Sequence, residues 1–170
     1  MADWVTRYSR QILCEHIGLE RQGAICQGTA AIVGLGALGS AAANMLARAG
    51  VGTLILIDHD RVELDNLQRQ TLYDEANAAE AENKALAAAR RLEAINSQVR
   101  LEAHPCRLDS SNAERLLAPA QVIVDGVDDF VTRYLLKDVA CKLGIPYVYG
   151  AVLSSFGITM TILPGQTPCL

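Results

Sequence analysis

The stretch TAAIVGLGALGSAAANML, residues 29–46, decides the fold, because a short apolar run passes through a glycine turn into a series of small residues. Gly34, Gly36 and Gly39 give it the spacing G-x-G-x-x-G. At the end of a buried strand, the first glycine permits a tight turn, the second lets a phosphate approach the backbone, and the third lets the next helix pack on the strand. The stretch predicts a nucleotide-binding strand, turn and helix, although such a turn can also serve packing alone.

Strand and helix patterns alternate along the rest of the chain. We expect strands at about 29–34, 53–58, 99–106, 121–130, 146–153 and 156–163, and helices at about 37–49, 84–96 and 131–144. Residues 4–27 have helical spacing, with Gly18 as a break between two short helices. Ser111 and Glu114 have the spacing of a capping box, which predicts the start of a helix there.

This order predicts an α/β fold of Rossmann-like, three-layer αβα type. Its sheet is expected to be largely parallel, because TLILID and similar runs are continuously apolar, with an antiparallel C-terminal strand. We expect two parts: an N-terminal helical segment, residues 1–28, and a Rossmann-like domain, residues 29–170, that is incomplete at its C-terminus.

Composition narrows the class of protein. A chain of 170 residues suits one domain, and a net charge of −4 argues against a nucleic-acid partner. The N-terminus lacks the apolar core of a signal peptide, and no run is apolar for long enough to cross a membrane, so no membrane partner is expected. Five scattered cysteines indicate a reduced, cytoplasmic protein, and we expect four of them to be buried thiols: Cys14, Cys26, Cys106 and Cys141.

A polar segment of 26 residues, 59–84, follows the second strand and is long for a connection in a compact domain, which is typical of a functional loop. It leaves the edge at which open α/β sheets bind ligands. Asp58 stands where an acidic residue hydrogen-bonds a ribose hydroxyl, a group that both ATP and NAD carry. Asp60 is either a second ligand contact or a solvated loop carboxylate.

Several ordered motifs resemble the ubiquitin-activating superfamily, specifically its bacterial ThiF, MoeB and HesA group of adenylyltransferases. They are RYSRQ (7–11), the glycine turn, DHDRVELDNLQRQ (58–70), Lys84 and DGVDDF (125–130), and the likeness runs from Tyr8 to Cys169. The resemblance implies ATP and magnesium as cofactors. It also implies adenylation of the C-terminal glycine carboxylate of a ubiquitin-like sulfur-carrier protein, with release of pyrophosphate, by a cytoplasmic homodimer.

The resemblance also assigns roles to residues. Arg69 and Lys84 contact the ATP phosphates, Asn66 and Gln70 hold their loop, Asp128 coordinates magnesium, and Arg10 reaches the ATP site of the neighbouring subunit. Each cation has an ordinary alternative, a surface ion pair for Arg69 and Arg10 and a solvated helix lysine for Lys84. Asp125 is an alternative structural carboxylate that ends its strand. The expected catalytic set is Arg10, Arg69, Lys84 and Asp128.

Two features depart from the family pattern. Asp129 replaces the asparagine that usually follows the magnesium aspartate, and so adds negative charge close to a polyphosphate. Cys169 matches the first cysteine of a structural zinc site built from two C-x-x-C pairs, and one cysteine cannot hold zinc. The sequence is therefore expected to be the front of a longer protein, in which Cys169 would bind zinc.

Two other functions stay open at this stage. One is an NAD-dependent Rossmann oxidoreductase, which would want a catalytic histidine or lysine near its substrate. His16, His59 and His104 lie outside any recognisable pattern, and we expect them to be surface or structural residues. The other is a non-catalytic partner subunit that lends Arg10 to a complete homologue.

Overall fold

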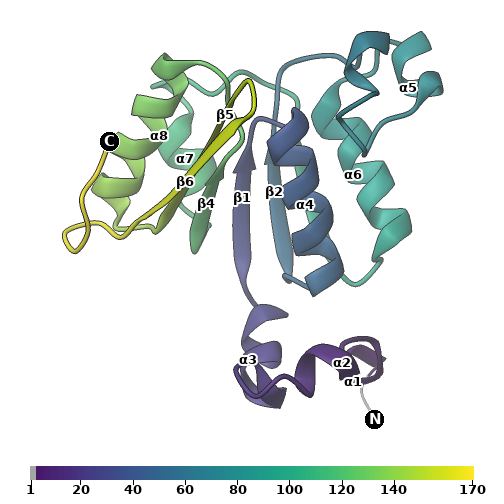
Figure 1. Cartoon of the computed structure of the whole chain (residues 1–170), viewed down its shortest axis with the longest axis vertical. Helices are drawn as coiled ribbons and strands as arrows, with labels where there is room; N and C mark the ends of the chain where they lie inside the picture. Colours follow the sequence, from purple (N-terminus) through teal and green to yellow (C-terminus); the bar gives the residue numbers. More distant parts are fainter. Residues whose placement is uncertain (1–2) are drawn as a thin grey trace.

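A six-stranded sheet forms the centre of the computed structural model, which describes residues 3–170 (Figure 1). The strand order is β3-β2-β1-β4-β5-β6. The first five strands of this order are parallel to their neighbours, and β6 pairs with β5 in antiparallel register. This confirms the predicted fold class and its antiparallel last strand. The strands are β1 (Thr29–Val33), β2 (Thr53–Ile57), β3 (Arg100–His104), β4 (Val122–Asp125), β5 (Tyr147–Leu153) and β6 (Phe156–Ile162).

Helices cover both faces of the sheet and complete three layers. Side chains alternate along β1, so Ile32 packs in the cluster beneath α4 and α6, whereas Ala31 and Val33 pack in the cluster beneath α7 and α8. Each cluster has members with no exposed surface, such as Leu92 on α6 and Leu136 on α8. The helices of the domain are α4 (Ala37–Ala49), α5 (Glu75–Ala79), α6 (Lys84–Ile95), α7 (Ala113–Leu117) and α8 (Phe130–Leu143), with a 3₁₀ turn η1 (Leu64–Asn66).

The N-terminal segment lies at the amino edge of the sheet, next to the start of β1 (Figure 1). Its helices are α1 (Asp3–Arg7), α2 (Ser9–Ile12) and α3 (Gly18–Ile25). Tyr8 fixes it there, because its ring packs on Gly50 after α4 and its hydroxyl accepts a hydrogen bond from Asn96 Nδ2 at 2.8 Å. The α4 and α6 helices run against the strands, so both contacts lie at the end of the domain opposite the glycine turn.

Several local predictions are corrected. Residues 4–27 hold three short helices and not two, with Gly18 at the first position of α3. The segment 59–84 contains η1 and α5. The capping box at Ser111 and Glu114 is wrong: Asn112 precedes α7, and Ser111 instead donates to the Asp109 carboxylate.

The expected burial of the cysteines is also wrong. Cys14 and Cys141 are exposed, and Cys26 and Cys106 are partly exposed. All five cysteines are free thiols. Within residues 3–170, no helix combines the length and the apolar character needed to cross a membrane.

The glycine turn is as tight as its spacing predicts. Gly34 has a φ of +80°, and a Cβ atom there would lie 2.7 Å from the Gly126 carbonyl. A Cβ atom at Gly39 would overlap the Gly34 carbonyl oxygen, so only glycine lets α4 approach β1 this closely. Gly36 differs from both, because a Cβ atom there would meet only Gln70 Nε2, at 3.9 Å. Gly34 and Gly39 are therefore packing requirements, whereas the space beside Gly36 is open.

Asp129 begins α8 as its N-cap, and its side chain accepts a hydrogen bond from the Thr132 amide at 2.8 Å. Partial burial works against its ionisation, but the hydrogen bonds from Thr132 and the charge of Arg107 outweigh that effect, so the pKa of Asp129 lies below its ordinary value of 3.8. Asparagine caps helices about as well as aspartate. The family asparagine and this aspartate can therefore do the same structural work.

We expect Gly39→Ala to lower the free energy of unfolding by about 2–3 kcal/mol or to prevent folding, because the added methyl overlaps the Gly34 carbonyl. Urea denaturation followed by circular dichroism measures this. Gly157→Ala is the control, since a Cβ atom there meets nothing within 4 Å, and its effect should stay below about 0.5 kcal/mol. Equal effects of the two substitutions would contradict the packing role of Gly39.

We expect Asp129→Ala to cost about 1 kcal/mol of stability at pH 7, and Asp129→Asn to cost less than about 0.5 kcal/mol, because only asparagine keeps the cap. The folded-state pKa of Asp129 is depressed, so the stabilisation by its charge is present above the ordinary value of 3.8 and is lost as pH falls through the lower folded-state value. The stability of the wild type relative to Asp129→Asn should therefore decline only below pH 3.8, in urea titrations. A difference that is constant down to pH 2 would contradict this role.

Candidate nucleotide site

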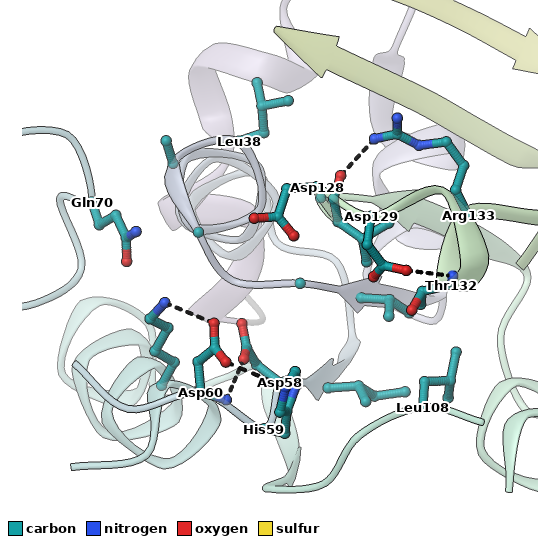
Figure 2. A pocket seen from close by; sticks show the side chains of 18 of the residues that line it. Leu38, Asp58, His59, Asp60, Gln70, Leu108, Asp128, Asp129, Thr132 and Arg133 are labelled. Carbon is teal, nitrogen blue, oxygen red and sulfur yellow. Dashed lines mark hydrogen bonds and ion pairs between the residues drawn. The ribbon is translucent and has the colours of Figure 1, made fainter. Parts of the chain in front are cut away.

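A cleft of about 920 Å³ opens at the carboxyl ends of β1, β2 and β4 (Figure 2). This is the edge at which open α/β sheets bind ligands. Gly39 lies behind the glycine turn and does not line the cleft, and neither do Arg10 and Cys169. The structure brings the other expected site residues together in its wall: Gly34, Gly36, Asp58, Asp60, Asn66, Arg69, Gln70, Lys84, Asp128 and Asp129.

Asp58 directly follows β2 and holds the glycine turn in place. Its Oδ2 accepts a hydrogen bond from the Leu35 amide at 2.6 Å, and its Oδ1 accepts one from the Asp60 amide at 2.8 Å. Only 8% of the residue is exposed. A carboxylate has about four lone-pair positions, so these two bonds leave capacity for a ribose hydroxyl. That contact stays a prediction.

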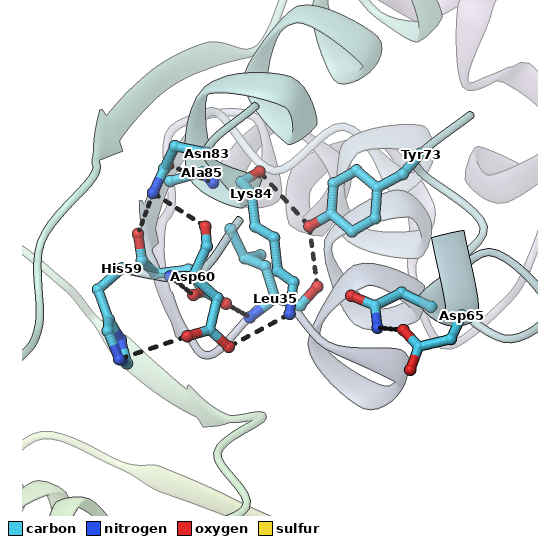
Figure 3. Close-up of polar contacts among 10 residues, drawn as sticks. Leu35, His59, Asp60, Asp65, Tyr73, Asn83, Lys84 and Ala85 are labelled. Carbon is cyan, nitrogen blue, oxygen red and sulfur yellow. Dashed lines mark hydrogen bonds and ion pairs between the residues drawn. The ribbon is translucent and has the colours of Figure 1, made fainter. Parts of the chain in front are cut away.

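Lys84 is a buried cation and not a solvated helix lysine. Its side chain is 9% exposed, and Nζ lies 3.2 Å from Asp60 Oδ2 (Figure 3). Its own amide donates to the Asp60 carbonyl at 2.9 Å, and Asn83 caps the first turn of α6 through the amides of Ala85 and Leu86. Both the backbone and the ammonium of Lys84 are therefore fixed at the cleft, and Asp60 is its partner and not a merely solvated carboxylate.

The loop at residues 65–70 closes on itself around Asn66. The Asn66 carbonyl accepts hydrogen bonds from the amides of Arg69 and Gln70, at 3.1 and 3.0 Å. The Arg69 guanidinium donates to the Asp65 carbonyl at 3.0 Å, and no carboxylate of residues 3–170 pairs with it. Arg69 is thus an exposed cation beside the cleft and is not held in the expected alternative, a surface ion pair.

Gln70 carries an unsatisfied buried acceptor. The residue is 3% exposed, and its Oε1 has no hydrogen-bond partner among the described residues. Buried polar atoms are nearly always hydrogen-bonded, so an orphan in the wall of a cleft indicates a ligand or an ordered water. This is the feature of the site that most directly calls for an occupant.

Asp128 is free, whereas the acidic residues around it serve the protein. Its carboxylate is exposed and points into the cleft beside the glycine turn (Figure 2), and it makes no hydrogen bond or ion pair within residues 3–170. Asp125 is buried against Arg133 Nε at 2.9 Å and the Tyr147 hydroxyl, which confirms the structural alternative for Asp125. Burial, and then the hydrogen bond with Asp125, raise the pKa of Tyr147 far above its usual range.

Arg133 is a site residue that the sequence analysis missed. It is 5% exposed, donates to the carbonyls of Val127 and Gly150, and lies 4.8 Å from the centre of the Tyr149 ring. It therefore braces the loop that carries Asp128. The signal lay in the spacing of an aspartate at a strand end and an arginine one turn into the next helix, but nothing in that spacing distinguishes a buried pair from an exposed one.

His59 is exposed, as expected of a surface residue, but it also belongs to the wall of the cleft. It lines the cleft, with Nε2 3.3 Å from Asp60 Oδ1, and about half of its side chain is exposed. Its position two residues after β2, between the expected ligand residues Asp58 and Asp60, was the available signal. Asp58, His59 and Asp60 bring one potential metal-ligand atom each within 4.8 Å of one another, but protein donors already occupy both carboxylates. Cys106, Arg107 and Phe130 also line the cleft and were not predicted.

Arg10 and Cys169 lie apart from the cleft. Arg10 is exposed on α2, at the opposite edge of the sheet, and forms no ion pair with the described part of the chain. Cys169 is exposed near the C-terminus and belongs to no cluster of potential metal ligands in residues 3–170. Their assigned roles stay predictions.

Known proteins match both the sequence and the fold. The sulfur carrier protein ThiS adenylyltransferase of Bacillus subtilis is 47% identical over 164 residues, which are 96% of this chain and 49% of that protein. The sulfur carrier protein adenylyltransferase of Thermus thermophilus is 44% identical over 146 residues, or 86% of this chain and 53% of that protein. The chain thus spans about half the length of these curated relatives.

Among solved structures, that of E. coli MccB with ATP superposes with a TM-score of 0.82 at 26% identity, covering 96% of this chain and 49% of MccB. A further MccB structure, with succinimide, gives a TM-score of 0.85 at 25% identity, over 96% of this chain and 50% of MccB. The model of the ThiF family matches residues 8–170. With its fold, its glycine turn and its cleft, this chain belongs to the ThiF family.

Proposed function

We propose that this chain is the ATP-binding part of an enzyme that adenylates the C-terminal glycine carboxylate of a ubiquitin-like sulfur-carrier protein. The observation that carries the proposal is that Lys84 is buried and fixed by Asp60 in the wall of the cleft. The same cleft is lined by Gly36, which has free space beside its Cα, and by the unpaired Asp128. The relatives that are named adenylyltransferases of sulfur carrier proteins support it.

The residues of the cleft suit a nucleoside triphosphate. The turn at Gly36 and the start of α4 offer backbone amides, and Arg69 and Lys84 offer two cations of different kinds, one exposed and one buried. Asp128 would hold magnesium, which prefers one or two carboxylates together with phosphate oxygens and water. The orphan acceptor on Gln70 supports an occupant on that side of the cleft. When bound, the metal neutralises phosphate charge.

The attack in this reaction does not require a general base among these residues. The carrier carboxylate is already ionised at neutral pH, so it can attack the α-phosphorus without a general base. The new bond joins its oxygen to that phosphorus as the bond to the bridging oxygen breaks, and the electron pair leaves with pyrophosphate. Arg69 and Lys84 would stabilise the charge that grows on the leaving group, and Asp58 would orient the ribose.

The proposal extends to a homodimer in which Arg10 of one copy serves the cleft of the other. Arg10 is exposed and unpaired within residues 3–170, and its guanidinium fork suits phosphate oxygens. The five free thiols fit a cytoplasmic location. In a longer protein, Cys169 would supply one ligand of a structural zinc ion.

We expect ATP with magnesium, at a hundredfold excess over Kd, to raise the free energy of unfolding by about 2.7 kcal/mol. ATP in the presence of EDTA should stabilise the protein much less, and so should NAD without ATP. Arg69→Ala and Asp128→Ala should lose the effect, because they remove the exposed cation and the metal carboxylate. Differential scanning fluorimetry measures all of these shifts.

Arg91→Ala and Glu93→Ala are matched controls, since both side chains are exposed on α6 and do not line the cleft. They should respond to ATP as the wild type does. Stabilisation by NAD together with no response to ATP would overturn adenylation and support an oxidoreductase.

A further prediction concerns the dimer. Arg10→Ala and Asp128→Ala should each abolish ATP–pyrophosphate exchange with B. subtilis ThiS as the probe, and an equal mixture should recover about a quarter of the wild-type rate. Random mixing makes half of the dimers mixed, and each mixed dimer has one intact site. No recovery would contradict sharing of Arg10. A different outcome would favour the non-catalytic partner. In it, the wild type alone shows no exchange, but exchange appears when it is mixed with a full-length relative whose arginine corresponding to Arg10 is replaced by alanine.

A further inference from the structure

Both backbone polar groups of Leu35 are held by side chains, and its carbonyl belongs to the peptide that joins Leu35 to Gly36. The Leu35 amide donates to Asp58 Oδ2 at 2.6 Å, and the Leu35 carbonyl accepts a hydrogen bond from the Tyr73 hydroxyl at 2.8 Å (Figure 3). Leu35 has no exposed surface, and Tyr73 is 7% exposed. The central residue of the glycine turn is therefore anchored through both of its backbone polar groups, away from solvent.

Anchoring the Leu35 carbonyl also decides where the next amide points. In a trans peptide, the C=O and the following N–H point in opposite directions. The Gly36 N–H is therefore directed away from Tyr73. Gly36 lines the cleft, and its amide donates no hydrogen bond to the backbone of residues 3–170. The Gly36 N–H is thus available to donate a hydrogen bond to a ligand in the cleft.

We propose that Tyr73 is a positioning residue of the nucleotide site, whose hydroxyl keeps the Gly36 N–H facing the phosphates and the Leu35 carbonyl turned away from them. Without that hydroxyl, the peptide can rotate and present a carbonyl oxygen to the phosphates, which exchanges a donor for a repelling acceptor. This inference rests on the proposed function, because it needs ATP as the ligand.

Two further contacts make Tyr73 a link between separate parts of the site. Its hydroxyl lies 3.4 Å from the Lys84 carbonyl, and its amide donates to the Gln70 carbonyl at 3.3 Å. Burial first, and then the charges of Asp58 and Asp60, raise the pKa of Tyr73 far above its usual range. The hydroxyl is therefore protonated at neutral pH and can act as a donor to the Leu35 carbonyl.

The test is Tyr73→Phe, which removes one oxygen and leaves the ring in the core. We expect Kd for ATP with magnesium to rise about tenfold in isothermal titration calorimetry, as expected for one hydrogen bond to a charged group. Kd for adenosine should be unchanged, because adenosine has no phosphate to meet Gly36. Tyr8→Phe is the control, since it also loses a buried hydrogen bond, but at the amino edge of the sheet.

Each result decides one question. No binding of ATP by the wild type would overturn the proposed function itself. Wild-type binding with an unchanged Kd in Tyr73→Phe would overturn the positioning role alone, and so would an equal loss of affinity for ATP and adenosine. A second measurement needs no variant: in hydrogen–deuterium exchange, ATP with magnesium should slow exchange of the Gly36 amide, and adenosine should not. Equal protection by both ligands would also overturn the positioning role.

Discussion

The backbones of Gly34, Gly39 and Gly126 touch one another at the carboxyl end of β1, and the other features of the molecule depend on this contact. A side chain at any of these three positions would overlap the backbone of another. The contact brings the first turn of α4 against the point where β1 and β4 part. After β1 the chain crosses to one face of the sheet, and after β4 it crosses to the opposite face. A cleft therefore remains between these two connections. The site is thus a consequence of backbone packing.

Most acidic residues at this edge are paired with donors of the protein itself. This pairing explains how a chain with a net charge of −4 can offer a site for an anion. Asp58 is bonded to the glycine turn, Asp60 to Lys84, Asp125 to Arg133, and Asp129 to the first turn of α8. Each of these carboxylates is satisfied by protein donors. Asp128 alone among these five makes no such bond, and it is the one that the family resemblance assigns to a metal.

The sequence was informative where the signal is local. The helix at 37–49, its end at Gly50 and the alternation of strands and helices along the chain follow from residues that are neighbours in the sequence, and the structure agrees with them. The burial of Lys84 was beyond such reasoning, because it depends on Asp60 and on the loop between them. Arg133, Tyr147 and Tyr73 were missed for the same reason: their polar atoms meet partners brought together only by the fold.

Two wrong predictions have related causes. Ser111 and Glu114 have the right spacing for a capping box, but the nearer Asp109 carboxylate takes both the amide and the hydroxyl of Ser111. Cys14 lies in the bend after α2 and Cys141 on α8, and both face solvent although they have apolar neighbours in the sequence. Average preferences for burial carry no information on which face a residue occupies.

The location of the N-terminal helices sets the geometry of any assembly that shares Arg10. These helices lie at the amino edge of the sheet (Figure 1), whereas the residues that line the cleft lie at its carboxyl edge. A symmetric pair that exchanges Arg10 must therefore place its two sheets with their strands running in opposite directions, so that each arm meets the far end of its neighbour. In such a pair both clefts would be completed by one association step, and dilution below the dissociation constant of the pair would switch both off together.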